Sequence, residues 1–222
     1  MLRMSTYFCY KPNEMKDTRP YHHGNLKQAL LDASLELIRE VGPEAFTLRE
    51  VARRAGVSHN APYRHFRDKS ELLAAVAAEG FDRLTESMTK AADSGSDALD
   101  RFRLSGRGYV QFALRYPQHF TVMFEAPKRF DTHPEALAAG ERAFTTLVRY
   151  IEECQSAGSL PPGDSKQLAL LAWSMVHGVA KLAIAGRLPF SGIDQMLQFT
   201  DAAGHALMYG ISNASGLTVR HP

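Results

Sequence analysis

The sequence predicts an all-α protein with a small N-terminal domain of three helices and a larger helical C-terminal domain. Apolar residues recur every three or four positions along most of the chain, which is the spacing of one helix face. Capping residues, glycines and prolines stand where these stretches would begin and end. A polar break at residues 93–97 follows the basic front of the chain and predicts the domain boundary.

The composition indicates an ordinary soluble globular protein. Of the 222 residues, 45% are hydrophobic and 23% are charged, and the net charge is only +2. Two cysteines, Cys9 and Cys154, are too few for a disulfide framework and fit a reducing cytoplasm. The longest apolar run, residues 168–180, is interrupted and too short to span a bilayer, so we expect no membrane.

The N-terminal stretch is expected to precede the folded part. Residues 1–20 show no helical period and contain two prolines, which predicts a flexible arm. Arg19, His22 and His23 could reach DNA from there, and a solvated tail is an equally good interpretation. A long helix is expected from Asn25, and Gly42-Pro43 ends it.

Residues 47–66 are predicted to form two short helices joined by a tight turn. Thr47 and Glu50 match a capping box at the start of the first helix. Gly56 suits the left-handed residue that ends this helix, and Ser58 can cap the next one. Together these features indicate a helix-turn-helix, whose second helix is free to enter a major groove. A plain helical hairpin is the alternative.

The local charge favours a nucleic-acid partner. Residues 47–69 carry six basic against two acidic side chains, whereas residues from 71 onward carry 14 basic and 16 acidic ones. Local positive charge is what a phosphate backbone requires. Pro62 complicates the second helix, because it removes the hydrogen bond to the Ser58 carbonyl and crowds that group. We therefore expect an irregular first turn or a late helix start.

The segment GVSHNAPYRHFRDKSELL resembles the TetR-type (TetR/AcrR) transcriptional regulators. The positions that carry the resemblance are Ala55, Gly56, Val57, Ser58, Tyr63, His65, Phe66 and Lys69. It is specific over residues 21–80 and weaker elsewhere. It implies a DNA-binding domain at residues 21–85 and a helical regulatory, ligand-binding and dimerisation domain at residues 95–215. WSMVHG, at residues 173–178, resembles the tryptophan–x–x–x–histidine–glycine motif of one TetR subgroup.

The predicted DNA-binding residues come from the same segment. They are Thr47, Ser58, His59, Asn60, Ala61, Tyr63, Arg64, His65 and Lys69. Residues 59–61 are expected to read base edges, since asparagine pairs with adenine and alanine contacts a thymine methyl. The resemblance implies phosphate contacts for Tyr63, His65 and Lys69, while Arg64 is either a phosphate contact or a solvated charge.

Later helices are expected from apolar periodicity at residues 68–84, 98–115, 118–125, 135–157, 165–187 and 192–211. The last two are apolar on two faces, so each needs two partners. This predicts a homodimer in which each subunit gives two helices to a four-helix interface, and burial in a larger monomer core is the alternative. The predicted interface residues are Leu168, Met175, Val179, Met196, Ala203 and Leu207.

The resemblance also implies a small-molecule pocket in the C-terminal domain. Its predicted lining is aromatic, with a few polar tips, and packed core is the alternative for each member. The predicted ligand-binding residues are Tyr109, Phe112, Phe120, Phe124, Phe144, Trp173 and His177. For His177, a hydrogen-bonded core position is the stronger interpretation.

Catalytic and metal-binding patterns are absent from the sequence. It holds no glycine-rich phosphate loop, HExxH, GxSxG or CxxC pair, and its nine histidines are scattered, so we expect no enzyme, cofactor or metal. The leading hypothesis is a cytoplasmic homodimeric regulator of a palindromic double-stranded DNA operator, a repressor released by an unknown small apolar effector. A ligand-independent helical DNA-binding or partner-docking protein is the alternative, and an enzyme with an incidental hairpin comes third.

Overall fold

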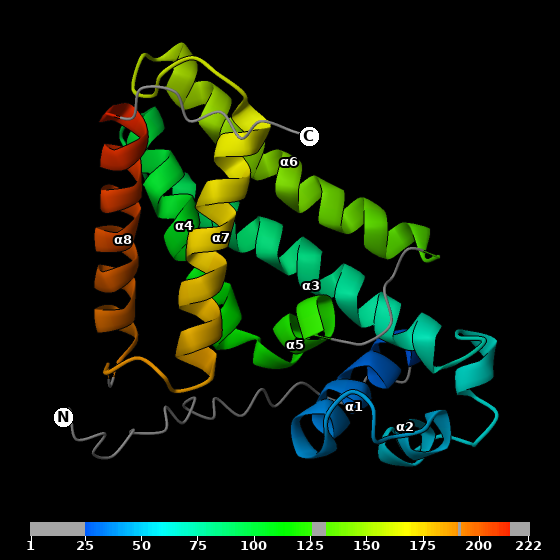
Figure 1. Ribbon diagram of the computed structural model, residues 1–222. Helices are drawn as coiled ribbons and strands as arrows, with labels where there is room; N and C mark the ends of the chain where they lie inside the picture. Colours follow the sequence, from blue (N-terminus) through cyan, green and yellow to red (C-terminus); the bar gives the residue numbers. More distant parts are fainter. Residues whose placement is uncertain (1–24, 126–131, 191, 214–222) are drawn as a thin grey trace, which may run out of the picture. The chain divides into compact units, whose positions relative to one another are not determined.

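The computed structural model describes residues 25–125, 132–190 and 192–213, and within these ranges it is all-α, as predicted (Figure 1). The elements are α1 (Leu26–Val41), α2 (Leu48–Arg54), the 3-10 helix η1 (Pro62–Arg64), α3 (Lys69–Ala92), α4 (Ala98–Arg115), α5 (Pro117–Glu125), α6 (Pro134–Ser156), α7 (Ser165–Ile184) and α8 (Ile193–Asn213). The predicted arm, with Arg19, His22 and His23, lies outside the described residues.

The ends of the first helices follow the predicted signals. The Asn25 side chain accepts a hydrogen bond from the Gln28 amide at 3.2 Å and caps α1, and Gly42, at φ 83°, follows its last turn. The capping box of α2 is confirmed, because the Thr47 hydroxyl accepts from the Glu50 amide and the Glu50 carboxylate accepts from the Thr47 amide.

Contacts divide the described residues into two compact units. The N-terminal unit comprises residues 25–83, 116–125 and 132–142, and the C-terminal unit comprises residues 84–115, 143–190 and 192–213. Helices α3 and α6 therefore contribute to both units. The loop at residues 93–97 joins α3 to α4 within the C-terminal unit. The domain ranges 21–85 and 95–215 stay a prediction.

Helices α1, α2, α3 and α5 contribute buried apolar side chains to the N-terminal unit. Its buried side chains include Leu30, Leu37, Phe46, Val51, Phe66, Leu72, Val76 and Phe120. A polar cluster joins α3 to α5: Arg83 bonds Glu79 at 2.6 Å, and Nε2 of His119 lies 3.7 Å from the same carboxylate. Burial raises the pKa of Glu79, but the contacts with His119 and Arg83 outweigh burial and lower it to about 2.

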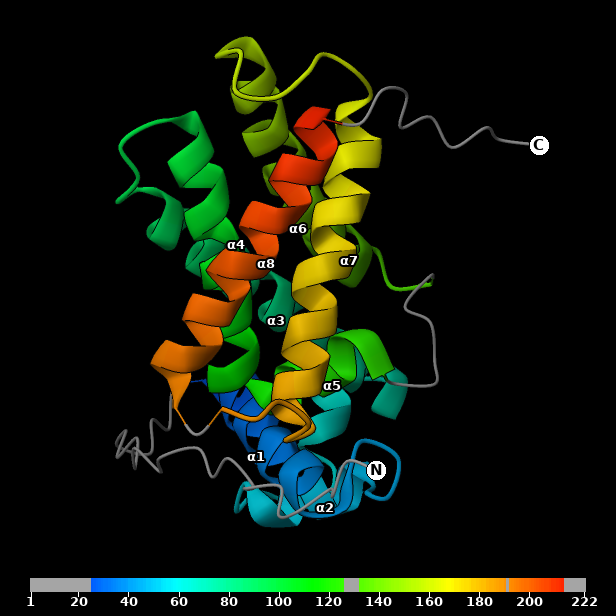
Figure 2. The same ribbon diagram turned by 60° about the vertical axis from the view of Figure 1, so that its left-hand side comes forward.

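The C-terminal unit is arranged around α4. Helices α7 and α8 lie side by side, and both pack on α4 (Figures 1 and 2). Helix α3 approaches α4 at Gly108, where an added Cβ would come within 2.5 Å of the Ser87 carbonyl oxygen, so only glycine fits. A cluster of buried side chains joins α4 and α7 to α6 through Phe102, Leu147, Tyr150, Ile151, Leu168 and Ala169.

Candidate nucleic-acid interface and ligand cavity

The turn after α2 has the geometry that the sequence predicts for a helix-turn-helix. Gly56 adopts φ 69°, a left-handed conformation that side chains with a Cβ disfavour. The Val57 amide donates to the Ala52 carbonyl at 3.0 Å, and the Gly56 amide donates to the Arg53 carbonyl at 3.2 Å. These two bonds form a Schellman motif, which ends α2 and redirects the chain.

The segment after this turn is less regular than a full recognition helix. Residues 58–61 form turns, and only Pro62–Arg64 is helical, as a 3-10 helix. Pro62 has no N–H, and the Ser58 carbonyl instead accepts from the Ala61 amide at 2.9 Å. The expected irregularity at Pro62 is therefore confirmed. The expected Ser58 cap is wrong, because the N-cap residue is Ala61 and no side chain caps η1.

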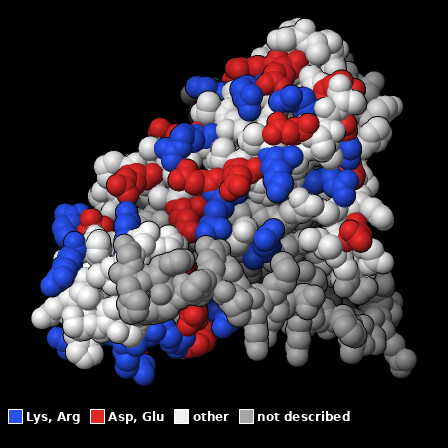
Figure 3. Space-filling model, turned by 180° about the vertical axis from the view of Figure 1, so that it is seen from behind, with Lys and Arg blue, Asp and Glu red and all other residues white. Residues whose placement is uncertain are grey.

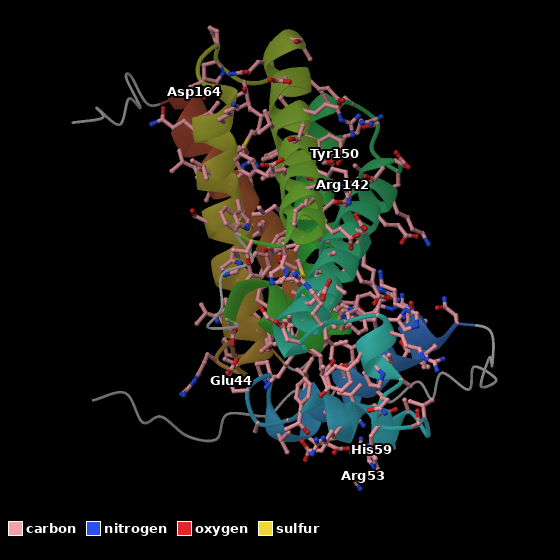
Figure 4. All side chains as sticks on the ribbon, turned by 90° about the vertical axis from the view of Figure 1, so that its right-hand side faces the viewer. Glu44, Arg53, His59, Arg142, Tyr150 and Asp164 are labelled. Carbon is pink, nitrogen blue, oxygen red and sulfur yellow. The ribbon has the colours of Figure 1, made fainter. Side chains whose placement is uncertain are left out.

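Most predicted base and phosphate contacts lie on the surface of this segment. The exposed members are Thr47, Ser58, His59, Asn60, Tyr63, Arg64 and His65. Ala61 is the exception: its exposed fraction is 8%, so the structure corrects its expected contact with a thymine methyl. The backbone turn points this side chain into the unit. His59 and Arg53 project from the same end of the N-terminal unit (Figure 4).

Positive charge at this end is supplied by fewer side chains than the sequence suggested. Arg49, Arg53 and Arg64 are exposed and form no ion pair among the described residues. Arg54 is bound to carboxylates of α1, which the sequence did not predict. Basic side chains project at the lower left of Figure 3, where the N-terminal unit lies when it is seen from behind.

Lys69 has partners within the unit. Its Nζ donates to the Glu44 carbonyl at 2.7 Å and lies 4.5 Å from the centre of the Phe46 ring. Asp68 caps the start of α3, since its carboxylate accepts from the Glu71 amide at 2.9 Å. The phosphate contact predicted for Lys69 therefore requires one of two changes. Either a second N–H of the ammonium group donates to the phosphate, or the ammonium group gives up its hydrogen bond to the Glu44 carbonyl.

A cavity of about 100 Å³ lies in the C-terminal unit between α4, α7 and α8. Its lining is mostly apolar and comprises Met88, Leu99, Phe102, Arg103, Ser105, Gly106, Tyr109, Leu147, Ala172, Met175, Val176, Thr200, Gly204, His205 and Met208. Leu99 and His205 are exposed, whereas Phe102 and Val176 are buried, so the cavity has an open rim and a closed floor.

Only one of the seven predicted ligand-binding residues lines this cavity. Tyr109 does so, and Trp173 and His177 bond its hydroxyl at 3.2 and 2.9 Å. Burial raises the pKa of Tyr109, so this hydroxyl stays protonated. The remaining four are placed elsewhere: Phe144 packs on Trp173, Phe112 is buried, and Phe120 and Phe124 belong to the N-terminal unit.

Sequence reasoning missed most of the lining because it looked for aromatic residues. The missed residues on α4 follow a helical spacing of three or four, at Leu99, Phe102, Gly106 and Tyr109. That spacing was visible in the sequence. Thr200, Gly204 and Met208 on α8 repeat every four residues, and this second row was also visible.

The predicted dimer residues lie on the inward side of α7 and α8. Leu168, Val179 and Met196 are buried within the chain, with Met196 only 1% exposed, so they are not available to a partner subunit in this conformation. Met175 lines the cavity. Ala203 and Leu207 are partly exposed. Burial within the chain therefore accounts for three of the six predicted residues, and the interface itself stays a prediction.

The opposite faces of α7 and α8 carry exposed apolar and small residues. On α7 they are Leu170, Ser174 and Leu182, together with the partly exposed Gly178, and on α8 they are Phe199, Ala202, Ala206, Tyr209 and Gly210. We call these nine residues the outward face. No described atom comes within 4 Å of a Cβ built at Gly178 or Gly210, so both helices are open to close approach there.

Helix α7 carries more apolar surface than the chain buries. By length and composition it is long and apolar enough to cross a membrane, with a mean hydropathy of 1.4, although the apolar run at residues 168–180 was expected to be too short. Helices in protein cores meet the same criterion, and α7 packs on α4 and α8.

Among the described residues, no group of three His, Cys, Asp or Glu side chains is placed to hold a metal.

Comparison with known proteins gives matches along most of the chain. A family model described as bacterial regulatory proteins of the tetR family matches residues 30–76. A second, described as a tetracyclin repressor-like C-terminal domain, matches residues 102–203. The HTH-type transcriptional repressor Rv3405c of Mycobacterium tuberculosis is 27% identical over 157 residues, which cover 63% of this chain and 84% of that protein.

Solved structures share the fold over most of the chain. A protein of unknown function from Rhodococcus sp. RHA1 is 36% identical, with a TM-score of 0.74, and 88% of this chain covers all of it. The regulator FadR of Bacillus subtilis, solved in complex with stearoyl-CoA, has a TM-score of 0.70 at 15% identity. The match covers 83% of this chain and 98% of FadR, and at this identity it shows the fold only.

Proposed function

Because the chain belongs to the tetR family of bacterial regulatory proteins, we propose that it is a homodimeric, sequence-specific DNA-binding repressor released by a small apolar ligand. It acts by binding rather than by catalysis, and it works in the cytoplasm, where its DNA is. Its relatives are named as transcriptional regulators. Some of them are named repressors and one is a named activator.

The observation that carries this proposal is the surface after the Gly56 turn. His59, Asn60 and Tyr63 are exposed there, and Arg49 and Arg53 of the preceding α2 are exposed as well. Amide and imidazole groups can bond base edges, while arginines neutralise phosphates. The combination suits a major groove, in which the base-reading residues need flanking positive charge.

The outward face supports the dimer. Phe199 and Tyr209 are 39% and 69% exposed on α8, and Leu170 and Leu182 are exposed on the neighbouring α7. Exposed apolar residues in continuous rows mark interaction surfaces. Two copies related by a two-fold axis would bury these rows in a four-helix interface, and the small residues between them would allow close packing. Such a dimer would present two reading segments to half-sites about 34 Å apart.

The cavity supports a ligand-dependent response. Helix α8 carries Thr200 and Gly204 on the cavity side and Ala202 and Ala206 on the outward face. A ligand that enlarges the cavity would move α8 and with it the dimer interface. The ligand changes DNA binding only to the extent that it prefers one arrangement of the dimer over the other.

The test is an electrophoretic mobility shift with DNA upstream of the protein's own coding region, at several stated salt concentrations. We expect Tyr63→Ala to weaken binding to all sequences alike, and Asn60→Ala to change the preferred sequence at one base pair. Wild-type affinity that is equal for this DNA and for random DNA would contradict sequence-specific repression.

A ligand-independent DNA-binding or partner-docking protein is the second candidate. It is favoured by the volume of the cavity, about 100 Å³, which is below the roughly 300 Å³ of ordinary ligand pockets. Thermal unfolding in the presence of a broad panel of apolar compounds separates the two. Stabilisation by at least one compound, together with its release of DNA, supports the ligand-responsive repressor.

A further inference from the structure

The charged and polar groups around the cavity indicate what kind of effector it accepts. We propose that the effector of the repressor is electrically neutral, with a hydrocarbon or aryl part in the cavity, and that Asp201 enforces this by masking Arg103. The inference rests on the proposed ligand-responsive function and adds the chemical class of the ligand and a specificity-determining residue.

Arg103 is the permanently charged side chain in the lining, and two carboxylates hold it. Its Nη2 lies 2.7 Å from Oδ1 of Asp100, and its Nη1 lies 2.8 Å from Oδ1 of Asp201. Arg107 lies 3.5 Å from the other oxygen of Asp201. Two arginines and two aspartates thus form a group with no net charge. The carboxylate of an anionic ligand would have to displace Asp201 from Arg103 to gain an ion pair.

The buried hydroxyl groups of the lining are also engaged. Ser105 donates to the Phe102 carbonyl at 2.6 Å, and Thr200 donates to the Met196 carbonyl at 2.8 Å. The Tyr109 hydroxyl is bonded by both Trp173 and His177. An ionised ligand group pushed past the rim would therefore lose its hydration without gaining a free donor in the floor, which is costly.

The size of the cavity limits the ligand to a single ring or a short chain. An engineered apolar cavity of about 150 Å³ holds benzene, and this cavity measures about 100 Å³. Met88, Met175 and Met208 line it. Because methionine side chains are unbranched and adaptable, a modest expansion to accept a ring or chain costs little.

The binding test uses two matched probe pairs, toluene with benzoate and hexane with hexanoate. Dissociation constants are measured by calorimetry on the full chain, as wild type and as Asp201→Asn. Wild type is expected to bind the neutral probe of each pair at least tenfold more tightly. Asp201→Asn removes the negative charge that neutralises Arg103, although its amide oxygen can still accept a hydrogen bond from Nη1. It should improve binding of the anionic probes about tenfold while leaving the neutral ones unchanged.

Two further variants locate the effect. Asp194→Asn removes a carboxylate from the same helix outside the cavity lining, and it should leave the dissociation constant of every probe unchanged. Gly204→Ala adds a Cβ at 3.6 Å from Cε of Met175, an ordinary contact that fills cavity space without a clash. It should weaken every probe.

The outcomes separate this inference from the proposed function. A wild type that prefers the anionic probes, or binds none of them, overturns the neutral-effector inference. So does toluene binding that Gly204→Ala leaves intact, because toluene would then bind elsewhere. The mobility shift is run on the same preparation. Specific DNA binding without probe binding would overturn only the neutral-effector inference and keep the proposed DNA-binding function. Absence of specific DNA binding would contradict the proposed function, whatever the probes do.

Discussion

The guanidinium of Arg54 holds both oxygens of the Glu40 carboxylate, with Nη1 at 2.8 Å and Nη2 at 2.6 Å, and so ties α2 to the last turn of α1. Nη1 also bonds Glu36 at 3.1 Å. The two-pronged contact needs the planar fork of arginine, which lysine lacks.

We predict that Arg54→Lys lowers the thermal stability of the protein although it keeps the charge. The loss should shrink at 1 M salt, which screens such exposed pairs. The Arg54 hydrogen bond holds the pKa of Glu40 below its ordinary value of 4.5, so the contribution is present at neutral pH and is lost as the pH falls below 4.5. Thermal unfolding of wild type, Arg54→Lys and the exposed control Arg39→Lys measures this, and equal midpoints for all three would contradict it.

A second pH effect is expected from Glu79. Its pKa is lowered to about 2 from 4.5, so it stabilises the fold above pH 4.5 and loses this contribution as the pH falls toward 2. The shift corresponds to at most about 3 kcal/mol, and screening of a partly exposed pair reduces it to about 1–2 kcal/mol. Glu79→Gln should lower the free energy of unfolding by that amount at pH 7 and flatten its pH dependence. Urea unfolding at pH 7 and pH 3, with exposed Glu86→Gln as control, provides the test.

Arg53 is predicted to act through phosphates. Removing one phosphate contact reduces the slope of log affinity against log salt by about 1, and it weakens binding similarly on all sequences. Arg53→Gln should show both effects in a salt titration of DNA binding, whereas Arg149→Gln, an exposed arginine of the C-terminal unit, should show neither. A changed base preference in Arg53→Gln would instead assign this residue to base reading.

Ala61 is predicted to act through packing rather than through bases. Because its side chain is buried, Ala61→Leu should overpack the site and lower the free energy of unfolding by about 1–3 kcal/mol. The preferred DNA sequence of the folded fraction should be unchanged. Denaturant unfolding and a binding-site selection measure the two, with the exposed Ala138→Leu as control. If Ala61→Leu kept full stability and altered the preferred DNA sequence, Ala61 would instead be assigned to a base contact.

The outward face is predicted to hold the dimer together. An arginine placed there is buried without a partner on association, so Ser174→Arg with Ala206→Arg should give a monomer at micromolar concentration. Analytical ultracentrifugation distinguishes the two states, and Ala138→Arg, outside this face, should leave the assembly unchanged. A wild type that sediments as a monomer contradicts the interface.

Local signals were sufficient to predict the elements of the fold. The Thr47 capping box, the Gly56 turn and Gly42 act within a few residues of themselves, so they can be read from the sequence. Pro62 is the same kind of signal, and its disruption of the recognition segment was predicted correctly. Helix bounds for α4 agreed to the residue at both ends.

Tertiary placement was harder to predict. Which of the two apolar faces of α7 meets α4 depends on the partner helices, so the sequence did not show that Leu168, Val179 and Met196 are buried within the chain. The ion pair of Arg54 with Glu36 joins residues 18 positions apart, and no local spacing predicts it. The sequence prediction placed Phe120 in the ligand pocket of the C-terminal domain, whereas α5, which carries it, packs with the N-terminal helices.

The interleaved make-up of the two units bears on protein engineering. Residues 116–125 and 132–142 belong with the N-terminal unit although α4 precedes them in the chain. A fragment truncated after Ala92 would thus lack part of the core of the N-terminal unit. It would be a poor choice for an isolated DNA-binding domain. Chimaeras that exchange sensing modules between relatives should be spliced at three junctions, after Arg83, Arg115 and Arg142, so that each half travels complete.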